Sequence, residues 1–359
     1  MVEDGGDPLL HEWAYDAMGR LSDATLPGNA ADLMFEHFDD DSVMQVVHGG
    51  ANVVTGLTYH PEGPVDAIDV SDGMDPLLLL DYTVDDVLNV DAISEKRGTG
   101  TPQAFGYGYD EVYRLTTADY PAAFGLPATD AAYAYDGAGN RDDADTEGDP
   151  LATHAYDGNN RITASPSTPI LCHDADGNLT SKRSAGTCTS GTVTESFAWD
   201  ASNRLRTYTD AATGLTAEYT YDPFGRRIRK VVDADGGGMT YGEVTTWYVW
   251  DGDQLLAEYD TSGDRQVRYA YAGGFAPLQV AYDDGSGGED IYDVHSDHLD
   301  TPRMLTDASG GVRLAREPRG VRQRGAGHGQ HTPGALQHPL PGPVLRRGVG
   351  AARQLLPNV

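Results

Sequence analysis

The sequence predicts an all-β protein built from repeated antiparallel β-hairpins. A short phrase, Tyr-Asp-x-x-Gly-Arg/Asn-apolar, returns about every twenty residues, the segments beside it alternate in polarity, and no helical period is sustained. A repeat of this length is one supersecondary unit that buries its apolar face only by stacking on its neighbours. A chain organised in this way is typical of a scaffold rather than a catalyst.

The phrase occurs in eight variant copies along the chain. They read YDAMGRL (15–21), YDEVYRL (109–115), YDGAGNR (135–141), YDGNNRI (156–162), HDADGNL (173–179), WDASNRL (199–205), YDPFGRRI (221–228) and WDGDQLL (250–256). From the second copy onward we identify the motif aspartates as Asp110, Asp136, Asp157, Asp176, Asp200, Asp222 and Asp251.

Local rules explain each position of the phrase. The aromatic residue suits the end of a half-buried strand, and the aspartate after it accepts a hydrogen bond from its own backbone two residues on. The Gly or Asn supplies a positive φ at low steric cost, and Leu or Ile begins the return strand. We therefore expect a loop of three to five residues, a type I turn closed by a glycine bulge.

The flanking segments read as strands. Thr216–Asp222, Thr245–Asp251 and Arg265–Tyr271 alternate and are rich in aromatic and β-branched residues. Leu77–Val90 is apolar enough for a short helix, but its β-branched residues fit a strand about as well.

Two acidic stretches resemble the opening of a calcium-binding loop, DADGN from Asp174 and DADGG from Asp233. A full EF-hand loop needs a bidentate Glu at position twelve, where this chain has Ala185 and Val244. We reject an EF-hand, interpret the repeated aspartates as turn residues, and leave weak surface calcium binding open.

Composition limits the possible functions. The 359 residues are enough for a large core, and the net charge is −31. No apolar run is long enough to span a membrane, and the N-terminus lacks the features of a signal peptide. We expect a fragment of a longer chain, or export without a signal peptide. The acidity argues against nucleic acid as a partner.

The two cysteines, Cys172 and Cys188, flank one proposed turn and are sixteen residues apart. They could pair, which would add about 3 kcal/mol of stability in the chain-entropy model. Two free thiols remain the alternative.

Three features resemble the RHS family of YD-repeat proteins, which includes bacterial toxins and the animal teneurins. Besides the repeats, Gly56–Gly73 resembles a family segment, with Glu62 in place of an aromatic residue, and IYDVHSDHLDTPRMLTDASGGV (291–312) resembles the core signature. The resemblance covers roughly residues 13–312. Asp300 stands where the family has glycine, a tolerable replacement if φ is positive.

The resemblance implies that the hairpins wind into a spiral, shell-like sheet that holds a C-terminal effector, commonly a toxin, until delivery. It implies a secreted or cell-surface bacterial protein whose partners are the rest of the shell and that effector. His295, Asp297 and His298 have the chemistry of metal ligands, but the family gives this string no metal role. We identify no catalytic, cofactor-binding or metal-binding residue, and no cofactor.

The tail, residues 313–359, differs from the rest. Residues 312–359 carry eight arginines, one acid and no aromatic residue, a net charge of +7, which leaves −38 for residues 1–311. This composition is typical of disorder, or of a basic arm that binds nucleic acid or an acidic surface. A third reading is a frameshift near Val312–Ala315, because back-translation in the +1 frame restores family motifs. The tail would then lack the family's self-cleavage motif and effector, and the incomplete shell would form oligomers or aggregate.

The domain organisation expected is thus residues 1–312 as the repeat region, with its core signature at 291–312, followed by the basic tail. The function expected is a non-enzymatic structural fragment of a shell that encapsulates and delivers a toxin. The alternative is a surface adhesin or carbohydrate-binding module, with glycans as partners.

Overall fold

The computed structural model describes residues 12–26, 33–49, 53–122, 129–146, 154–165, 170–234, 242–272, 274 and 276–315. Within these ranges every regular element is a β-strand, and each strand pairs antiparallel with its neighbour in sequence. The predicted all-β fold of repeated hairpins is confirmed. Leu77–Val90, left between helix and strand, belongs to strands β7 and β8 and the turn between them. No helix in the described ranges could cross a membrane.

The first sheet has twelve strands in chain order. They are β1 (Glu12–Tyr15), β2 (Leu21–Thr25), β3 (Leu33–His37), β4 (Val43–His48), β5 (Val53–Tyr59), β6 (Val65–Ser71), β7 (Pro76–Val84), β8 (Val90–Arg97), β9 (Gln103–Tyr109), β10 (Leu115–Tyr120), β11 (Thr129–Tyr135) and β12 (Arg141–Thr146).

A separate hairpin follows, β13 (Ala155–Tyr156) with β14 (Ile162–Ala164), and then a sheet of thirteen strands, also in chain order. These are β15 (Ile170–His173), β16 (Leu179–Arg183), β17 (Val193–Trp199), β18 (Leu205–Asp210), β19 (Thr216–Tyr221), β20 (Arg227–Asp233), β21 (Glu243–Asp251), β22 (Gln254–Tyr259), β23 (Arg265–Ala270), β24 (Gln279–Asp283), β25 (Glu289–Ser296), β26 (Pro302–Asp307) and β27 (Val312–Ala315).

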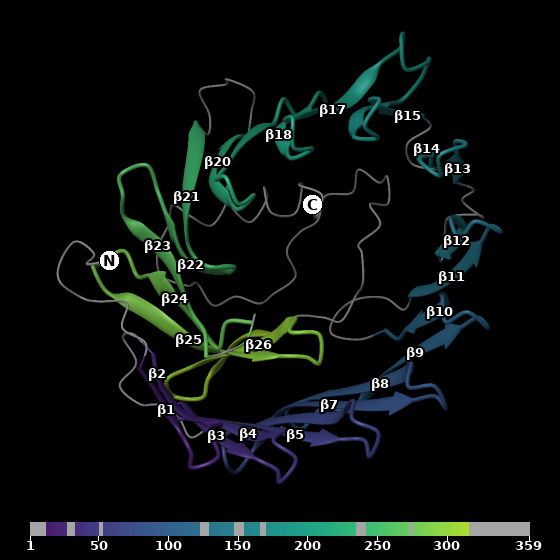
Figure 1. Cartoon of the computed structure of the whole chain (residues 1–359). Coiled ribbons are helices and arrows are strands. Elements are labelled where there is room, and N and C mark those ends of the chain that lie inside the picture. Colours follow the sequence, from purple (N-terminus) through teal and green to yellow (C-terminus); the bar gives the residue numbers. More distant parts are fainter. Residues whose placement is uncertain are drawn as a thin grey trace.

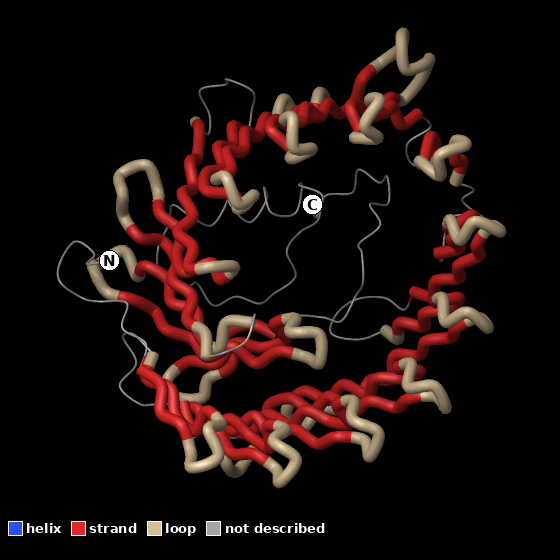
Figure 2. Tube along the Cα trace, in the orientation of Figure 1, coloured by secondary structure: helices blue, strands red, loops and turns tan. Residues whose placement is uncertain are grey.

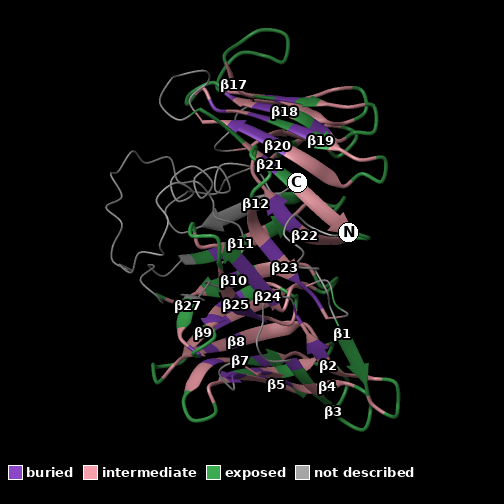
Figure 3. Cartoon of the chain, turned by 90° about the vertical axis from the view of Figure 1, so that its left-hand side faces the viewer, coloured by how far each residue is buried: buried purple, intermediate pink, exposed green. Residues whose placement is uncertain are grey.

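The strands follow one curved wall that turns back on itself, so that the late strands β24–β26 lie inside the curve against the early ones (Figure 1; Figure 2). Two apolar clusters join these layers. Met304 of β26 packs with residues of β5–β9, and Ala270 of β23 packs with Ala24, Leu33 and Val46. Most of the wall is one sheet thick, and buried residues recur as bands along its strands (Figure 3).

The predicted turn is confirmed and is commoner than the sequence indicated. In thirteen five-residue turns the first residue's N–H donates to the fifth carbonyl, and the fourth N–H donates to the first carbonyl. The turns are 16–20, 38–42, 60–64, 85–89, 110–114, 136–140, 157–161, 174–178, 200–204, 222–226, 260–264, 297–301 and 307–311. This is a type I turn followed by a left-handed residue, and a bulge adjoins it.

Two of the assigned motif aspartates are wrong. In the fifth copy the turn begins at Asp174, whose N–H bonds the Asn178 carbonyl, and Asp176 lies inside the loop. Asp251 pairs with Gln254 across a two-residue turn that has Gly252 at φ 52°, so it begins no five-residue turn.

The aspartate at the first position organises the loop with its side chain. In the turn from Asp222, Oδ1 accepts the N–H groups of Phe224 and Arg226, both at 2.9 Å, and Oδ2 accepts Nε of Arg226 at 2.7 Å. The same bonds at Asp16, with the backbone N–H of Arg20 the largest cause, lower the pKa of that carboxyl to about 2.

The fourth turn position always has a positive φ, but glycine is not required there. Seven turns have Gly, and the other six have Asp41, Leu88, Tyr113, Asn160, Asn203 and Asp300, with φ between 59° and 72°. Asp300 at φ 59° confirms the expectation for the residue that replaces the family's glycine. Leu88 and Tyr113 are unexpected, because bulky side chains are strained in this region.

Eight aromatic residues link one hairpin to the one before it, and six of them stand directly before a five-residue turn. Each hydroxyl or indole N–H donates to a carbonyl just after the preceding turn, at 2.7–3.0 Å. The pairs are Tyr59–Val43, Tyr109–Val90, Tyr135–Leu115, Tyr156–Arg141, Trp199–Leu179, Tyr221–Leu205, Trp250–Arg227 and Tyr271–Leu255. We call these bonds the aromatic staples. Each staple supplies a side-chain hydrogen-bond donor to a backbone carbonyl at the point where the β-bulge interrupts the hydrogen bonds between strands.

The two cysteines are joined in a disulfide. Cys172 lies in β15, but Cys188 lies in the loop between β16 and β17, not on the opposite arm of the hairpin as expected. Because β15 is the outermost strand of its sheet, the bond ties an edge strand to a loop.

The predicted boundary at Val312 falls within β27. The frameshift proposed near Val312–Ala315 would fall in this strand. Residues 316–359, most of the basic tail, lie outside the described residues.

Tyr113→Gly is expected to raise the free energy of unfolding by about 0.5–1.5 kcal/mol. Glycine relieves the backbone strain at this left-handed position, and this gain exceeds the entropic cost of ordering a glycine on folding. Urea denaturation measures this. Gly225→Ala, at φ 89° in open space, is the reverse control and should lower stability by about 1 kcal/mol. A destabilised Tyr113→Gly variant would contradict this account of the turn.

Tyr221→Phe removes one aromatic staple and keeps the ring. We expect a loss of about 1–2 kcal/mol in urea denaturation, because the Leu205 carbonyl loses its donor. Tyr113→Phe is the control, since that ring is 60% exposed at a turn. Equal stabilities for the two variants would show that the staple contributes nothing.

Candidate functional site

The core signature forms the place where the wall closes on itself. We call β25, β26 and the turn between them the closing segment, residues 289–307. It contains both HSDHLD and TPR, and its side chains contact β4, β5, β7 and β8. The contacts are mostly polar and buried.

His295 is the centre of the first polar contact. Its Nδ1 is 2.8 Å from the Thr55 hydroxyl, its Nε2 is 2.8 Å from the Thr306 hydroxyl, and its ring centroid is 4.7 Å from that of His48. Burial, and then the neighbouring His48, hold the pKa of His295 well below its ordinary value. A neutral imidazole has one donor and one acceptor nitrogen, which two hydroxyls satisfy together.

His48 connects this contact to a carboxylate on the closing segment. Its Nδ1 lies 3.6 Å from Oδ1 of Asp293, and both side chains are buried. The separation is an electrostatic contact rather than a hydrogen bond.

A buried ion-pair network forms the second polar contact. Arg303 of β26 bonds Glu95 of β8, and its Nη1 lies 3.4 Å from Oδ2 of Asp297. The other oxygen of Glu95 accepts Nε of Arg97 at 2.7 Å. Because Glu95 is 0% exposed and Arg303 5%, removal of either partner would leave the other buried charge with only its second partner, Arg97 for Glu95 and Asp297 for Arg303.

The residues weighed as metal ligands point to separate partners. Asp297 accepts the N–H groups of Leu299 and Thr301 as a turn aspartate, and the ring of His298 packs edge-to-face against that of Tyr82 with centroids 4.5 Å apart. Burial lowers the pKa of His298 and raises that of Tyr82 to about 12. In the described ranges no three His, Cys, Asp or Glu side chains are grouped to hold a metal ion.

The calcium-loop candidates are likewise structural. The carboxylate of Asp174 accepts the backbone N–H of Asn178 at 2.8 Å and its amide at 3.0 Å. Asp233 is the last residue of β20 and pairs with Glu243. Residues 235–237 of the second candidate lie outside the described residues.

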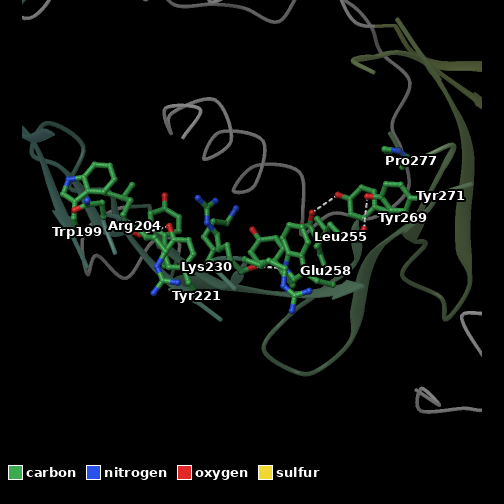
Figure 4. A pocket seen from close by; sticks show the side chains of 17 residues that line it. Trp199, Arg204, Tyr221, Lys230, Leu255, Glu258, Tyr269, Tyr271 and Pro277 are labelled. Carbon is green, nitrogen blue, oxygen red and sulfur yellow. Dashed lines mark hydrogen bonds between the residues drawn. The ribbon is translucent and has the colours of Figure 1, made fainter. Parts of the chain in front are cut away.

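A second feature is an open cleft of about 780 Å³ on the wall from β17 to β23. Figure 4 shows its side chains rising from one face of the sheet. Its floor is aromatic, with Trp199, Tyr219, Tyr221, Tyr248, Trp250, Tyr269 and Tyr271. Four of these rings, Trp199, Tyr221, Trp250 and Tyr271, come from aromatic staples.

The cleft lies on the inner face of the wall. In the first sheet the staple residue Tyr59 lines a pocket together with His295 and Val294 of the closing segment, which marks that face as the inside. Successive hairpins repeat the same antiparallel step, so equivalent positions keep the same face. Trp199, Tyr221, Trp250 and Tyr271 therefore face inward, as Tyr59 does.

The sequence did not predict the residues of strands β4 to β8 that the closing segment contacts. His48, Thr55, Tyr82 and Glu95 lie in four different strands and belong to no local motif. Thr55 is 240 positions from His295 and Glu95 is 208 from Arg303, and nothing in the local pattern signals either pairing.

The comparisons with known proteins agree with the repeat pattern. The RHS-repeat family model matches residues 199–237. The chain is 30% identical over 183 residues to the tRNA3(Ser)-specific nuclease WapA of Bacillus spizizenii, covering 50% of this chain and 7% of the relative. It is 31% identical over 153 residues to the toxin protein Tse5 of Pseudomonas aeruginosa (34% and 11%), and 33% identical over 120 residues to the probable deoxyribonuclease RhsB of Dickeya dadantii (33% and 8%).

Two solved structures share the fold. The TcdB2-TccC3-Cdc42 crystal structure superposes with a TM-score of 0.64 at 17% identity, over 84% of this chain and 16% of that one. The Photorhabdus luminescens Tc holotoxin pore gives 0.65 at 16% identity, over 86% and 16%. The chain thus spans about a tenth of its curated relatives and a sixth of these structures.

His295 makes stability depend on pH. Its pKa is lowered in the folded state, so the unfolded chain binds more protons below about pH 6.5, and stability is lost as the pH falls from there. We expect urea midpoints to decrease from pH 7 to pH 5 and His295→Gln to flatten that dependence. His37→Gln, in β3, is the control for the replacement of a histidine by glutamine. A wild-type slope that survives in His295→Gln would contradict this assignment.

Proposed function

This chain is an RHS/YD-repeat protein, and we propose that it forms part of a non-enzymatic β-shell that encloses and delivers a polypeptide effector. One observation carries the proposal. The wall curves back so that the closing segment seals onto β4–β8 through buried contacts, which gives the sheet distinct inner and outer faces.

The inner face supports enclosure chemically. Aromatic side chains gather there along β17–β22, where no second sheet of the described residues lies over them. Such a face can contact apolar groups of an unfolded polypeptide while the backbone of the wall keeps its own ladder bonds. The names of the relatives, the toxin protein Tse5 and the nucleases WapA and RhsB, are consistent with an effector carried by the longer proteins.

The proposal of a structural role rests on how polar groups are used. The carboxylates of the turns bond their own backbones, His295 bonds two threonine hydroxyls, and Arg303 pairs with Glu95. The nuclease activities named for the relatives would belong to effector segments outside the region matched here. Delivery outside the cell and the missing effector are likewise part of the proposal.

The adhesin and glycan-binding alternative has less support. Its strongest evidence was the abundance of Tyr and Trp, and the largest group of those rings lines the inner face. A glycan-binding surface of a shell would need them on the outer face.

Protease protection tests enclosure. An unstructured reporter fused to the C-terminus of the full chain is expected to be cleaved several-fold more slowly than the same reporter mixed with the chain. Arg303→Glu, which places two carboxylates together at the closing contact, should abolish the protection. Equal cleavage rates for the fused and mixed reporters would overturn the proposal.

A further inference from the structure

The inner cleft is cationic in an acidic protein. Its lining has four cations, Arg204, Arg226, Arg227 and Lys230, and a single acid, Glu258, whereas the whole chain has a net charge of −31. The local excess of positive charge makes the cleft unlike the rest of the wall.

Three of the four cations already have partners. Arg204 and Arg226 pair with the turn aspartates Asp200 and Asp222 at 2.8 and 2.7 Å. Lys230 is buried and also has an interaction partner. Glu258, the one acid, accepts the Tyr269 hydroxyl at 2.7 Å.

Arg227 is the exception. Its guanidinium lies 4.4 Å from the ring centroid of Tyr219 and 6.0 Å from that of Tyr221, and no carboxylate of the described residues pairs with it. Its Nε is buried without a hydrogen-bond partner. A guanidinium held flat by aromatic stacking offers its planar donors to a carboxylate in fixed geometry.

We propose that this cleft binds an extended acidic segment of the enclosed polypeptide, with a carboxylate on Arg227 and apolar side chains on the surrounding aromatic rings. The inference rests on the proposed function and specifies the chemistry of the enclosed polypeptide, the cargo, where it contacts this cleft. It favours cargo segments in which one Asp or Glu has apolar residues two positions before and after it, because side chains two apart along an extended chain face the same way.

The charge count favours a peptide over a nucleic acid. One uncompensated arginine suits one carboxylate, whereas a nucleic acid presents a phosphate at every nucleotide and needs several cations. The acidic surroundings would repel such a polyanion.

The cleft also sets the length of the segment. The strands from β17 to β23 span six inter-strand spacings, about 29 Å at roughly 4.8 Å each. An extended peptide of about nine residues covers this distance.

Fluorescence anisotropy of a labelled peptide of about nine residues, with one central Glu and with Leu two and four positions to either side of it, tests the proposal on the full chain. Wild type should bind it about tenfold more tightly than the peptide with Gln in place of Glu. Arg227→Gln should lose this preference, and Arg227→Lys should keep part of it, which separates lost charge from lost folding.

Arg229→Gln is the matched control. Arg229 also stacks on an aromatic ring, 5.5 Å from Trp247, but its strand position places it on the outer face. The control should keep the full preference for the acidic peptide.

Equal preference in Arg227→Gln and wild type would overturn the inference, and so would tighter binding of a single-stranded oligonucleotide of similar length. Neither result would affect protease protection of the fused reporter, so the proposed function would stand or fall separately.

Discussion

The structure depends on the coupling between an aspartate-headed turn and the aromatic residue before it. The aspartate fixes each loop at five residues by bonding two backbone N–H groups of the turn. The aromatic residue then reaches back to a carbonyl after the preceding turn. The aspartate's bonds set the geometry of a hairpin, and the aromatic residue's bond sets the distance between that hairpin and its neighbour. Repetition of these two kinds of bond builds the wall.

A wall one sheet thick has little core of its own, and the closing contact supplies part of what it lacks. Where the layers overlap, the late strands cover apolar residues of the early ones, as Met304 does over the cluster around Leu80 and Phe105. The contact also contains a buried ion pair and a pair of histidines. Buried polar groups of this kind add little net stability, but they penalise every alternative register in which they are unpaired.

Local chemistry decided what the sequence could predict. Strand reversal after Tyr-Asp, the positive φ at Asp300 and the all-β class follow from bonds within five residues, and all were predicted correctly. The misassignment of Asp176 for Asp174 came from two aspartates in one loop, of which only the first bonds the turn backbone. Leu88 and Tyr113 could not be predicted as left-handed residues, because only the fixed loop geometry imposes that strain.

Nothing local encodes which strands meet when the wall closes. The early-strand partners of His295 and Arg303, Thr55 and Glu95, lie more than 200 positions away, and each is an ordinary strand residue. Likewise, the cleft became recognisable only when the common face of Trp199, Tyr221 and Trp250 was known. The staples that built that face were predicted as aromatic strand ends, but not as hydrogen-bond donors.

A double-mutant cycle on Glu95 and Arg303 tests closure of the wall most directly. The free energy of unfolding would be measured in urea for wild type, Glu95→Gln, Arg303→Gln and the double variant. Direct contact across the layers predicts a coupling energy of about 1–3 kcal/mol, with the double variant less destabilised than the sum of the two single ones. Additive effects, within about 0.5 kcal/mol, would mean that the two side chains do not meet and that the wall does not close as described.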